Sequence, residues 1–504
     1  MQKSQQEHSN PNALIKTCNF VKNYHKKRSI KQRMKKLIPI LLIGLVIYIM
    51  IGALFPFIQQ PDISNETEER IHNYKRKYTI DDTTEERAYI LADNGEALEE
   101  RIRMISQAEE KIILSTFEFR SDESGKKVLS ALLSAAERGV QVQLLVDGVS
   151  GLINMKGNKY FYALSESENA EIKIYNPVSL LRPWSLMGRL HDKYLIADDT
   201  IYILGGRNTY DYFLGNQDSY KNYDWDVLVY NEEADQGESM KQLFSYFTGV
   251  WNLPECKEFY DRKRIWKNAS VKQAAEELTT IYKNMQQEHP EWFQTIDYYR
   301  KTEPVNHIQL VSNPTTCYAK EPIVFYTIAQ LMKNAKEEVV FHTPYIICNN
   351  WMLEELAEVS RAVPKVTMLT NSVANNGNPF GAMDYKYNKE KILDTGVQIL
   401  EYDGGISYHG KSFIIDNHLS AIGSFNWDMR STYIDTELML IIDSEAINKN
   451  LREAMGEYEK DSLIVTGIDD YMIPDGMEPQ KISNKRNIRI NLIRVFGRPF
   501  RFLM

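Results

Sequence analysis

Two short stretches of the chain repeat the same polar residues at the same spacing. "HDKYLIADD", which begins at His191, and "HGKSFIIDN", which begins at His409, each set a histidine and a lysine two residues apart before an apolar run. Side chains two apart on a strand point to the same face, so His191 shares a face with Lys193, and His409 with Lys411. Any fold for this chain has to explain both copies.

Each apolar run ends in a turn signal, "DDT" or "DNH", and a second apolar segment follows, "IYILGG" or "LSAIGS". This order predicts a hairpin in each copy. The returning strand brings Asn208 back beside His191 and Asn426 back beside His409. Glycines at the same ends of the hairpins let a ligand approach the backbone.

The segments before the two motifs also follow one order. "IILSTFEF", a helix, "VQVQLLVDG" and "AEIKIYNP" precede the first motif, whereas "VVFHTPYII", a helix, "KVTMLTNS" and "VQILEYDG" precede the second. The histidines lie about 218 residues apart, a spacing typical of a duplicated domain. Strands that alternate with helices indicate parallel pairing. We therefore expect an α/β fold of two duplicated domains, each a mostly parallel mixed sheet flanked by helices.

A long apolar segment runs from Leu37 to Ile58, about 22 residues without a charge, which is enough to span a bilayer. Its uniform apolarity argues against a buried core helix, and no small-residue cleavage site for a signal peptide follows it. The preceding segment is basic and the following one acidic. The positive-inside rule then predicts a single-pass anchor in the cell membrane, with a cytoplasmic N-terminus and extracytoplasmic catalytic domains.

Charge is spread unevenly along the chain, whose formal net charge is −8. Residues 1–36 carry about +9 and residues 481–504 about +7, which leaves about −24 for the rest. An acidic body argues against a nucleic-acid partner, because such proteins neutralise phosphates with Lys and Arg. The basic tail "NKRNIRINLIRVFGRPFRFLM" either lies on an anionic membrane surface or is a solvated, frayed end.

These features predict seven regions along the chain. They are a basic N-terminus (1–36), a transmembrane helix (37–58), a linker (59–87), a first domain (88–255), a helical linker (256–304), a second domain (305–465) and a basic tail (466–504).

The paired motifs offer a consistent chemistry. Two lysines and two asparagines suit a phosphodiester anion, and two histidines supply a nucleophile and a general acid. No clustered His or Cys spacing indicates a metal site, so we expect neither metal nor cofactor. Downstream, Asp226 and Glu437 stand in apolar strands, where an unpaired carboxylate is costly. Each is predicted to pair with a catalytic imidazole and fix its tautomer; a structural ion pair is the alternative.

The pattern H-x-K-x4-D followed by G-G/S-x-x-N, present twice between about residues 88 and 460, resembles the phospholipase D superfamily. "GGRNTYDYF" followed by "DWDVLVY" is most similar to its cardiolipin synthase and phosphatidyltransferase branch. The resemblance implies one active site shared by both halves and a two-step reaction. In that reaction His191 attacks phosphorus to form a phosphohistidine, while His409 protonates the leaving alcohol and deprotonates the incoming one.

The resemblance also assigns the remaining motif residues. Asp198 and Asp416 match the motif aspartates of the catalytic set, although their place at the hairpin turns predicts a structural role. Ser424 replaces the Gly206 of the first copy, so that one half alone offers a hydroxyl to a phosphate. With Asn208 and Asn426, Ser424 completes the predicted substrate-binding set.

The fold alone does not identify the substrate. "VSLLRPWSLMGR", before the first motif, is either a core plug or an exposed apolar patch that draws lipid from the membrane. A phosphatidyltransferase that makes cardiolipin from phosphatidylglycerol is the leading hypothesis, with phospholipid hydrolysis to phosphatidic acid as the alternative. A nuclease, the second alternative, requires basic clusters beside the motifs, and the sequence shows none there. A non-catalytic scaffold would have lost a motif histidine or lysine, and all four are present. A phospholipid and the membrane are the expected partners; the oligomeric state stays open.

Overall fold

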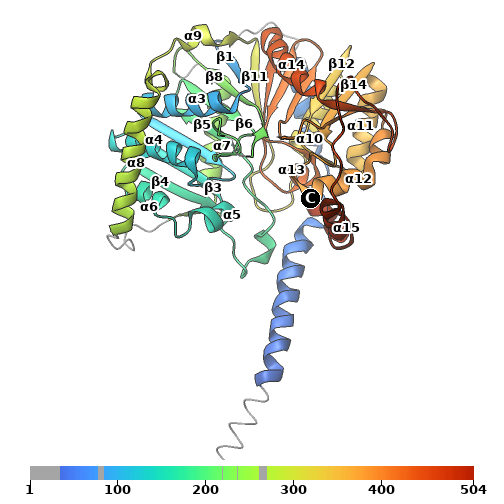
Figure 1. The fold of residues 1–504 in the computed structure, drawn as a ribbon, viewed down its shortest axis with the longest axis horizontal. Coiled ribbons are helices and arrows are strands. Elements are labelled where there is room, and N and C mark those ends of the chain that lie inside the picture. The colour runs from blue at the N-terminus through green and yellow to red at the C-terminus, as the bar shows by residue number, and fades with distance from the viewer. Residues whose placement is uncertain (1–33, 78–83, 218–219, 235–236, 260–268) are drawn as a thin grey trace, which may run out of the picture.

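The computed structural model describes residues 34–77, 84–217, 220–234, 237–259 and 269–504. The predicted basic N-terminus lies almost wholly outside these residues. Two α/β halves lie side by side, and one long helix leaves the body on one side (Figure 1).

That helix runs from Met34 to Phe57 and is the apolar segment that the sequence singles out. It has a mean hydropathy of 2.8 and is almost entirely exposed, as a membrane-spanning helix is when it stands free of the protein body. Its last turn is η1 (Phe55–Phe57), and Phe57 is buried in the core of the second half. We call Met34–Phe57 the anchor helix. Helix α2 (Asn65–Lys77) follows it.

The first half contains a mixed sheet with the strand order β10-β1-β8-β6-β5-β2-β3-β4-β9. Its strands are β1 (Arg87–Leu91), β2 (Lys111–Thr116), β3 (Gln141–Asp147), β4 (Ala170–Tyr175), β5 (Tyr194–Ala197), β6 (Ile201–Gly205), β8 (Asp226–Tyr230), β9 (Cys256–Glu258) and β10 (Glu303–Pro304). Its helices are α3 (Asn94–Gln107), α4 (Glu123–Glu137), α5 (Gly148–Ser150), α6 (Lys159–Ser165), α7 (Glu238–Trp251), α8 (Ala269–Glu288) and α9 (Tyr298–Lys301).

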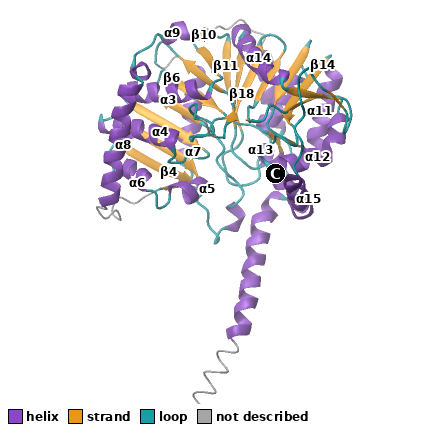
Figure 2. Ribbon diagram, viewed as in Figure 1, coloured by secondary structure: helices purple, strands orange, loops and turns teal. Residues whose placement is uncertain are grey.

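The second sheet has the order β11-β20-β18-β17-β12-β14-β15-β21-β22. From β11 to β21 it repeats the order of the first sheet from β1 to β9, which confirms the duplication; β10 and β22 are extra strands at opposite ends of the two sheets. The strands are β11 (His307–Ser312), β12 (Glu338–His342), β14 (Lys365–Asn371), β15 (Gln398–Tyr402), β17 (Ser412–Ile415), β18 (Leu419–Gly423), β20 (Leu438–Asp443), β21 (Ser462–Val465) and β22 (Tyr471–Met472). The helices are α10 (Ile323–Met332), α11 (Asn350–Ala362), α12 (Pro379–Leu393), α13 (Met429–Tyr433), α14 (Glu445–Lys460) and α15 (Asn484–Gly497). Helices cover the strands of both halves (Figure 2).

The pairing of the strands corrects one expectation. Within the described residues, parallel pairing in the two large sheets is confined to β2-β3-β4 and to β12-β14-β15, and the other strands run antiparallel. The sheets are therefore mixed but not mostly parallel. The helix-linked strands are parallel as expected, whereas the hairpins and the strands that return beside them reverse direction because their connections are short or fold straight back.

Two segments outside the predicted domains pack against them. In the predicted linker 256–304, β9 pairs with β4, and α8 buries Val271, Ala274 and Leu278 in the core of the first half. The predicted linker is therefore largely part of the first half. In the predicted tail, α15 packs against α12 and buries Ile490, so it is not a frayed end.

The two halves meet in one continuous core. Strand β7 (Asn222–Tyr223) pairs in parallel with β16 (Ser407–Tyr408), and Trp225 donates a hydrogen bond of 2.7 Å from Nε1 to the hydroxyl of Tyr408. A single buried cluster contains Leu204 of the first half and Ile422 of the second. This seam holds the two histidine motifs at a fixed distance from one another.

Candidate active site

Both predicted hairpins form in the predicted register. Tyr194 faces Leu204 across β5 and β6, and Ser412 faces Ile422 across β17 and β18. Continued toward the open end, these registers set His191 and His409 beside the residues before Asn208 and Asn426, as expected.

The motif aspartates lie at the opposite ends of the hairpins. Asp198 and Asp416 adopt the left-handed conformation, with φ of 51° and 52°. The carboxylate of Asp198 accepts hydrogen bonds from three successive backbone N–H groups, at residues 109–111, and Asp416 accepts them from residues 336–338. Each aspartate therefore fastens its hairpin turn to the start of a neighbouring strand, as the turn position predicts.

Each histidine is held by a carboxylate from the other half of the chain. Nδ1 of His191 lies 2.9 Å from Oε1 of Glu437, and Nδ1 of His409 lies 2.6 Å from Oδ2 of Asp224. A carboxylate at Nδ1 favours the tautomer that leaves the lone pair on Nε2 free to react. The predicted pairing of Glu437 with an imidazole is confirmed.

The corresponding prediction for Asp226 is wrong. Its carboxylate lies 2.8 Å from Arg101 and 3.2 Å from Arg207, and all three side chains are buried, so it belongs to a structural ion pair. Strand register explains the error: Asp226 faces Gly205, whereas Met439 faces the equivalent Gly423. The true counterpart of Glu437 is therefore Asp224, which the sequence analysis missed. Asp224 and Asp226 are two residues apart, so the alternation of a strand predicts the same face for both. Only the pairing of β6 with β8 shows which of them is equivalent to Glu437.

Ser424 also has a different place from the predicted one. Its buried hydroxyl donates to Oε2 of Glu437 and accepts from the backbone N–H of Leu438, at 3.0 Å, so it positions the carboxylate instead of offering itself to a phosphate. Gly206 occupies the equivalent place in the first half. A Cβ there would lie 2.2 Å from Oδ1 of Asp224, which explains why a side chain is absent.

Lys193 and Lys411 each lie close to the histidine of their own motif. Both are buried, and each ammonium contacts the backbone carbonyl of the histidine two residues before it. Lys411 also lies 3.4 Å from Asp224. Burial lowers the pKa of Lys193 to about 7, and burial likewise lowers the pKa of Lys411. A phosphate anion would supply a countercharge for Lys193 and a second one for Lys411.

The two imidazoles differ in their electrostatics. Burial and then Lys193 lower the pKa of His191 well below its usual value, and burial and then Lys411 lower the pKa of His409 to about 4. Burial raises the pKa of Glu437 to about 8. Although burial opposes it, Lys411 and His409 hold the pKa of Asp224 below its usual value, so Asp224 stays charged. His409 thus has the more strongly anionic partner.

The asparagines reach different surroundings. Asn208 accepts a hydrogen bond of 3.2 Å from the backbone N–H of Glu118, which fixes its amide. Asn426 donates to Ser431 at 3.3 Å, while its buried Oδ1 has no hydrogen-bond partner among the described residues. Asn426 also lines a pocket beside His191.

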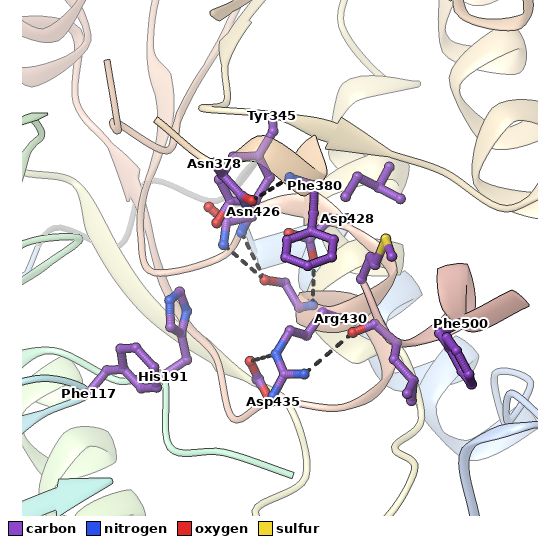
Figure 3. Close-up of a pocket in the computed structure, with 14 residues that line it drawn as sticks. Phe117, His191, Tyr345, Asn378, Phe380, Asn426, Asp428, Arg430, Asp435 and Phe500 are labelled. Atoms are coloured by element: carbon purple, nitrogen blue, oxygen red, sulfur yellow. Dashed lines mark hydrogen bonds and ion pairs between the residues drawn. The ribbon is translucent and has the colours of Figure 1, made fainter. Parts of the chain in front are cut away.

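This pocket has a volume of ≈ 380 Å³ and a polar and an apolar part. In Figure 3, His191 and Phe117 lie at one end and Phe500 at the other, with the ion pair of Arg430 and Asp435 between them. The remaining lining residues are Tyr345, Ile347, Asn378, Phe380, Asn426, Asp428, Ser431, Leu503 and Met504. The predicted tail therefore supplies a wall of the pocket, which no motif in the sequence indicated.

Within the described part of the chain, no group of three or more His, Cys, Asp or Glu side chains is placed to hold a metal ion. The arrangement can nevertheless perform acid–base and nucleophilic chemistry on a phosphodiester. It offers two imidazoles, each with a carboxylate at Nδ1, and two buried lysine side chains around one site.

Duplicated mixed sheets and one site built from two histidine motifs define a two-domain protein of the phospholipase D type. The family model described as "Cardiolipin synthase, PLD-like domain" matches residues 101–251 and 328–458, which is more than half of the chain. The protein belongs to this family.

Relatives extend the similarity over most of the chain. Cardiolipin synthase C of Escherichia coli (strain K12) is 26% identical over 403 residues, which cover 70% of this chain and 80% of that protein. Cardiolipin synthase of Clostridium perfringens (strain SM101 / Type A) is 27% identical over 392 residues, covering 75% and 70%. The crystal structure of phosphatidylserine synthase from Haemophilus influenzae Rd KW20 has a TM-score of 0.60 at 14% identity and covers 87% of this chain and 98% of that one. This last likeness concerns the fold.

Proposed function

We propose that the protein is a membrane-anchored phosphatidyltransferase that joins a phosphatidyl group to a lipid alcohol and so makes cardiolipin from phosphatidylglycerol. The reciprocal contacts of His191 with Glu437 and of His409 with Asp224 carry the proposal, because they prepare two imidazoles for a two-step transfer. The cardiolipin synthase relatives support the choice of substrate.

In the first step, Nε2 of His191 forms a bond to phosphorus and the bond to the glycerol oxygen breaks. His409 enters this step as the imidazolium, which Asp224 and the bound phosphate stabilise in the substrate complex; it gives its Nε2 proton to the departing alkoxide, and free glycerol leaves. In the second step, His409 takes the proton of the hydroxyl of a second phosphatidylglycerol, whose oxygen displaces the His191 nitrogen from phosphorus. Cardiolipin is released and both imidazoles return to their starting states.

The electrostatics favour this division of roles. His191, whose pKa lies well below its usual value and whose carboxyl partner has a pKa raised to about 8, stays neutral and nucleophilic. His409 faces a charged Asp224, which stabilises the imidazolium that an acid catalyst needs, and a bound phosphate adds negative charge nearby. Lys193 and Lys411 balance the phosphate in the dry site.

The pocket supports a lipid alcohol as acceptor. Asn426 and Asp428 offer acceptors near His191, while Phe380, Phe500 and Leu503 offer apolar surface at the other end. Water reaching the phosphohistidine would give phosphatidic acid instead, so the closed seam between the halves favours transfer over hydrolysis. We also propose that the anchor helix crosses the membrane once, with the N-terminus in the cytoplasm and both catalytic halves on the extracytoplasmic side.

Product analysis tests this function. The purified full chain is placed in phosphatidylglycerol vesicles with chelator, and the lipids and free glycerol are measured over time. Cardiolipin and glycerol in equal amounts support the proposal, and they disappear in His191→Ala and His409→Ala. His289→Ala, at a half-exposed histidine outside the site, is the matched control. Phosphatidic acid as the main product, or turnover independent of both histidines, contradicts the proposal.

A trapping experiment tests which histidine is the nucleophile. Phosphatidylglycerol labelled at phosphorus is mixed with enzyme and quenched with alkali, which preserves a phosphohistidine. His409→Ala is expected to retain protein-bound label, because it lacks the acid/base group but keeps the nucleophile, and His191→Ala is expected to retain none. The opposite pattern would exchange the two roles while leaving the two-step mechanism intact.

A further inference from the structure

Helix α15 carries apolar side chains on two opposite sides. Its inner side buries Ile490 beside Met383 of α12. On its outer side lie Ile488, Leu492, Val495 and Phe496, which are exposed by 55% (Leu492) to 71% (Phe496). We call these four residues the α15 outer face. A stripe at i, i+4 and i+7 on the exposed side of a packed helix is unusual for a helix that faces water.

The same segment is strongly basic. Residues 481–504 contain seven Lys and Arg and no Asp or Glu. Of these, Lys485, Arg489, Arg494 and Arg498 are exposed around the α15 outer face. Exposed apolar side chains surrounded by Lys and Arg are typical of a helix that lies in the interface of an anionic bilayer.

A second exposed apolar group lies beside the anchor helix. In the loop after β4, Leu180 and Leu181 are exposed by 56% and 82%. The backbone carbonyl of Leu181 accepts a hydrogen bond of 3.0 Å from the hydroxyl of Tyr48, so the loop runs along the anchor helix. Tyr48 precedes Ile58 by about 15 Å of helix, at about 1.5 Å per residue. The loop tip is therefore level with residues that the membrane itself surrounds.

Figure 1 places α15 on the side of the body where the anchor helix leaves it. We propose that the α15 outer face and the loop tip at Leu180 and Leu181 both insert into an anionic leaflet, so that the body rests on the bilayer at two points besides its anchor. This inference rests on the proposed membrane-anchored transferase and adds the surface through which it meets its lipid. The occupant of the surface is the bilayer, because the loop shares the depth of the anchor helix and the charge around α15 complements acidic headgroups.

The surface continues into the pocket. Helix α15 is followed directly by η6 (Arg498–Leu503), and Phe500 and Leu503 line the pocket that contains His191. A lipid leaving the leaflet beside α15 thus meets the apolar end of the pocket first. Insertion of the α15 outer face brings that end to the level of the acyl chains.

Spin labels measure insertion without any need for turnover. In a Cys18→Ser background, in which the remaining cysteines Cys256, Cys317 and Cys348 are buried, labels are placed at Leu181→Cys and Leu492→Cys in the full chain. Collisions with oxygen and with an aqueous nickel chelate are then compared in phosphatidylglycerol vesicles. Arg300→Cys on α9, a strongly exposed position on the side of the body away from the anchor helix in Figure 1, is the matched control.

We expect the oxygen-to-nickel collision ratio at Leu181 and Leu492 to exceed that at Arg300 by at least fivefold. In phosphatidylcholine vesicles, or after Lys485→Glu with Arg489→Glu, the ratio at Leu492 should fall while that at Leu181 stays high. A label at Leu492 that meets nickel as freely as the control overturns the proposal. Protection of Leu492 from both reagents overturns it as well and identifies a protein partner, a second copy included. Either result leaves the transferase proposal to its own product analysis.

Discussion

Asp224 of the first half lies 2.6 Å from His409 of the second, and Glu437 of the second half lies 2.9 Å from His191 of the first. The two contacts cross the seam in opposite directions. Each imidazole is therefore oriented by a carboxylate that lies just before a strand of the other half, β8 or β20, so the relative position of the halves decides both contacts.

Replacing the two nearby aspartates should separate catalysis from stability. Asp224→Asn is expected to lower kcat by about 10²–10⁴, since it disturbs the acid/base imidazole while the amide keeps the shape. Asp226→Asn leaves Arg101 and Arg207 short of a buried countercharge, and should lower the free energy of unfolding by about 3–5 kcal/mol. Thermal unfolding and initial rates of both variants check this. Equal effects of the two substitutions on kcat would contradict the assignment.

Gly206 and Ser424 should respond differently to alanine. In Gly206→Ala the new Cβ meets Asp224, so the carboxylate must move away from His409 and kcat should fall by about 10² or more. Ser424→Ala removes one hydrogen bond to Glu437 and should lower kcat roughly tenfold, equivalent to about 1.4 kcal/mol in the activation free energy. Steady-state kinetics on folded protein measure both. A larger loss in Ser424→Ala would restore the serine as a direct phosphate ligand.

The pH dependence of kcat/KM should follow the buried lysine. Lys193, with its pKa lowered to about 7, loses its positive charge as the pH rises through 7, and kcat/KM should then fall. The acid side should stay flat to about pH 5, because the pKa of the nucleophile His191 lies well below its usual value, so that His191 stays neutral there. Lys193→Arg keeps its charge at all these pH values, so its alkaline limb should move upward. A wild-type profile that is flat to pH 9 would exclude this role of Lys193.

The hairpin aspartates should affect stability alone. Asp198→Ala and Asp416→Ala each remove the acceptor of three backbone N–H groups at a left-handed residue, and should lower the free energy of unfolding by about 1–3 kcal/mol. Asp199→Ala, at the next position of the first turn, removes a partly exposed ion pair with Lys111 and should change stability by less than about 1 kcal/mol. Urea unfolding gives the stabilities. Loss of turnover at low temperature in fully folded Asp198→Ala would assign it to the chemistry instead.

Local sequence patterns were enough to predict the hairpins. The spacing of two residues between His191 and Lys193, the apolar run and the turn at Asp198 fix which residues share a face, and all of these act within one hairpin. The duplication followed from the repeated order of segments in the same way.

The contacts that the sequence did not predict depend on distant strands. Asp224 and Asp226 have equal claims by alternation, and the register of β8 against β6 alone decides which one reaches His409. The role of Ser424 depends on Glu437, and the pocket wall at Phe500 on the packing of α15. Such contacts are determined by packing between distant elements, and a local sequence pattern carries no information about that packing.

The crossed carboxylates also bear on how such a chain arose. A single half would hold a histidine without its carboxylate and a carboxylate without its histidine, so it becomes competent only on meeting a second copy of itself. A chain of half this length could therefore act only as a symmetric pair, whose assembly depends on its concentration. Fusion of two copies in one gene gives the partner a permanent and high effective concentration, and frees the two sites to diverge, one toward glycine and the other toward serine.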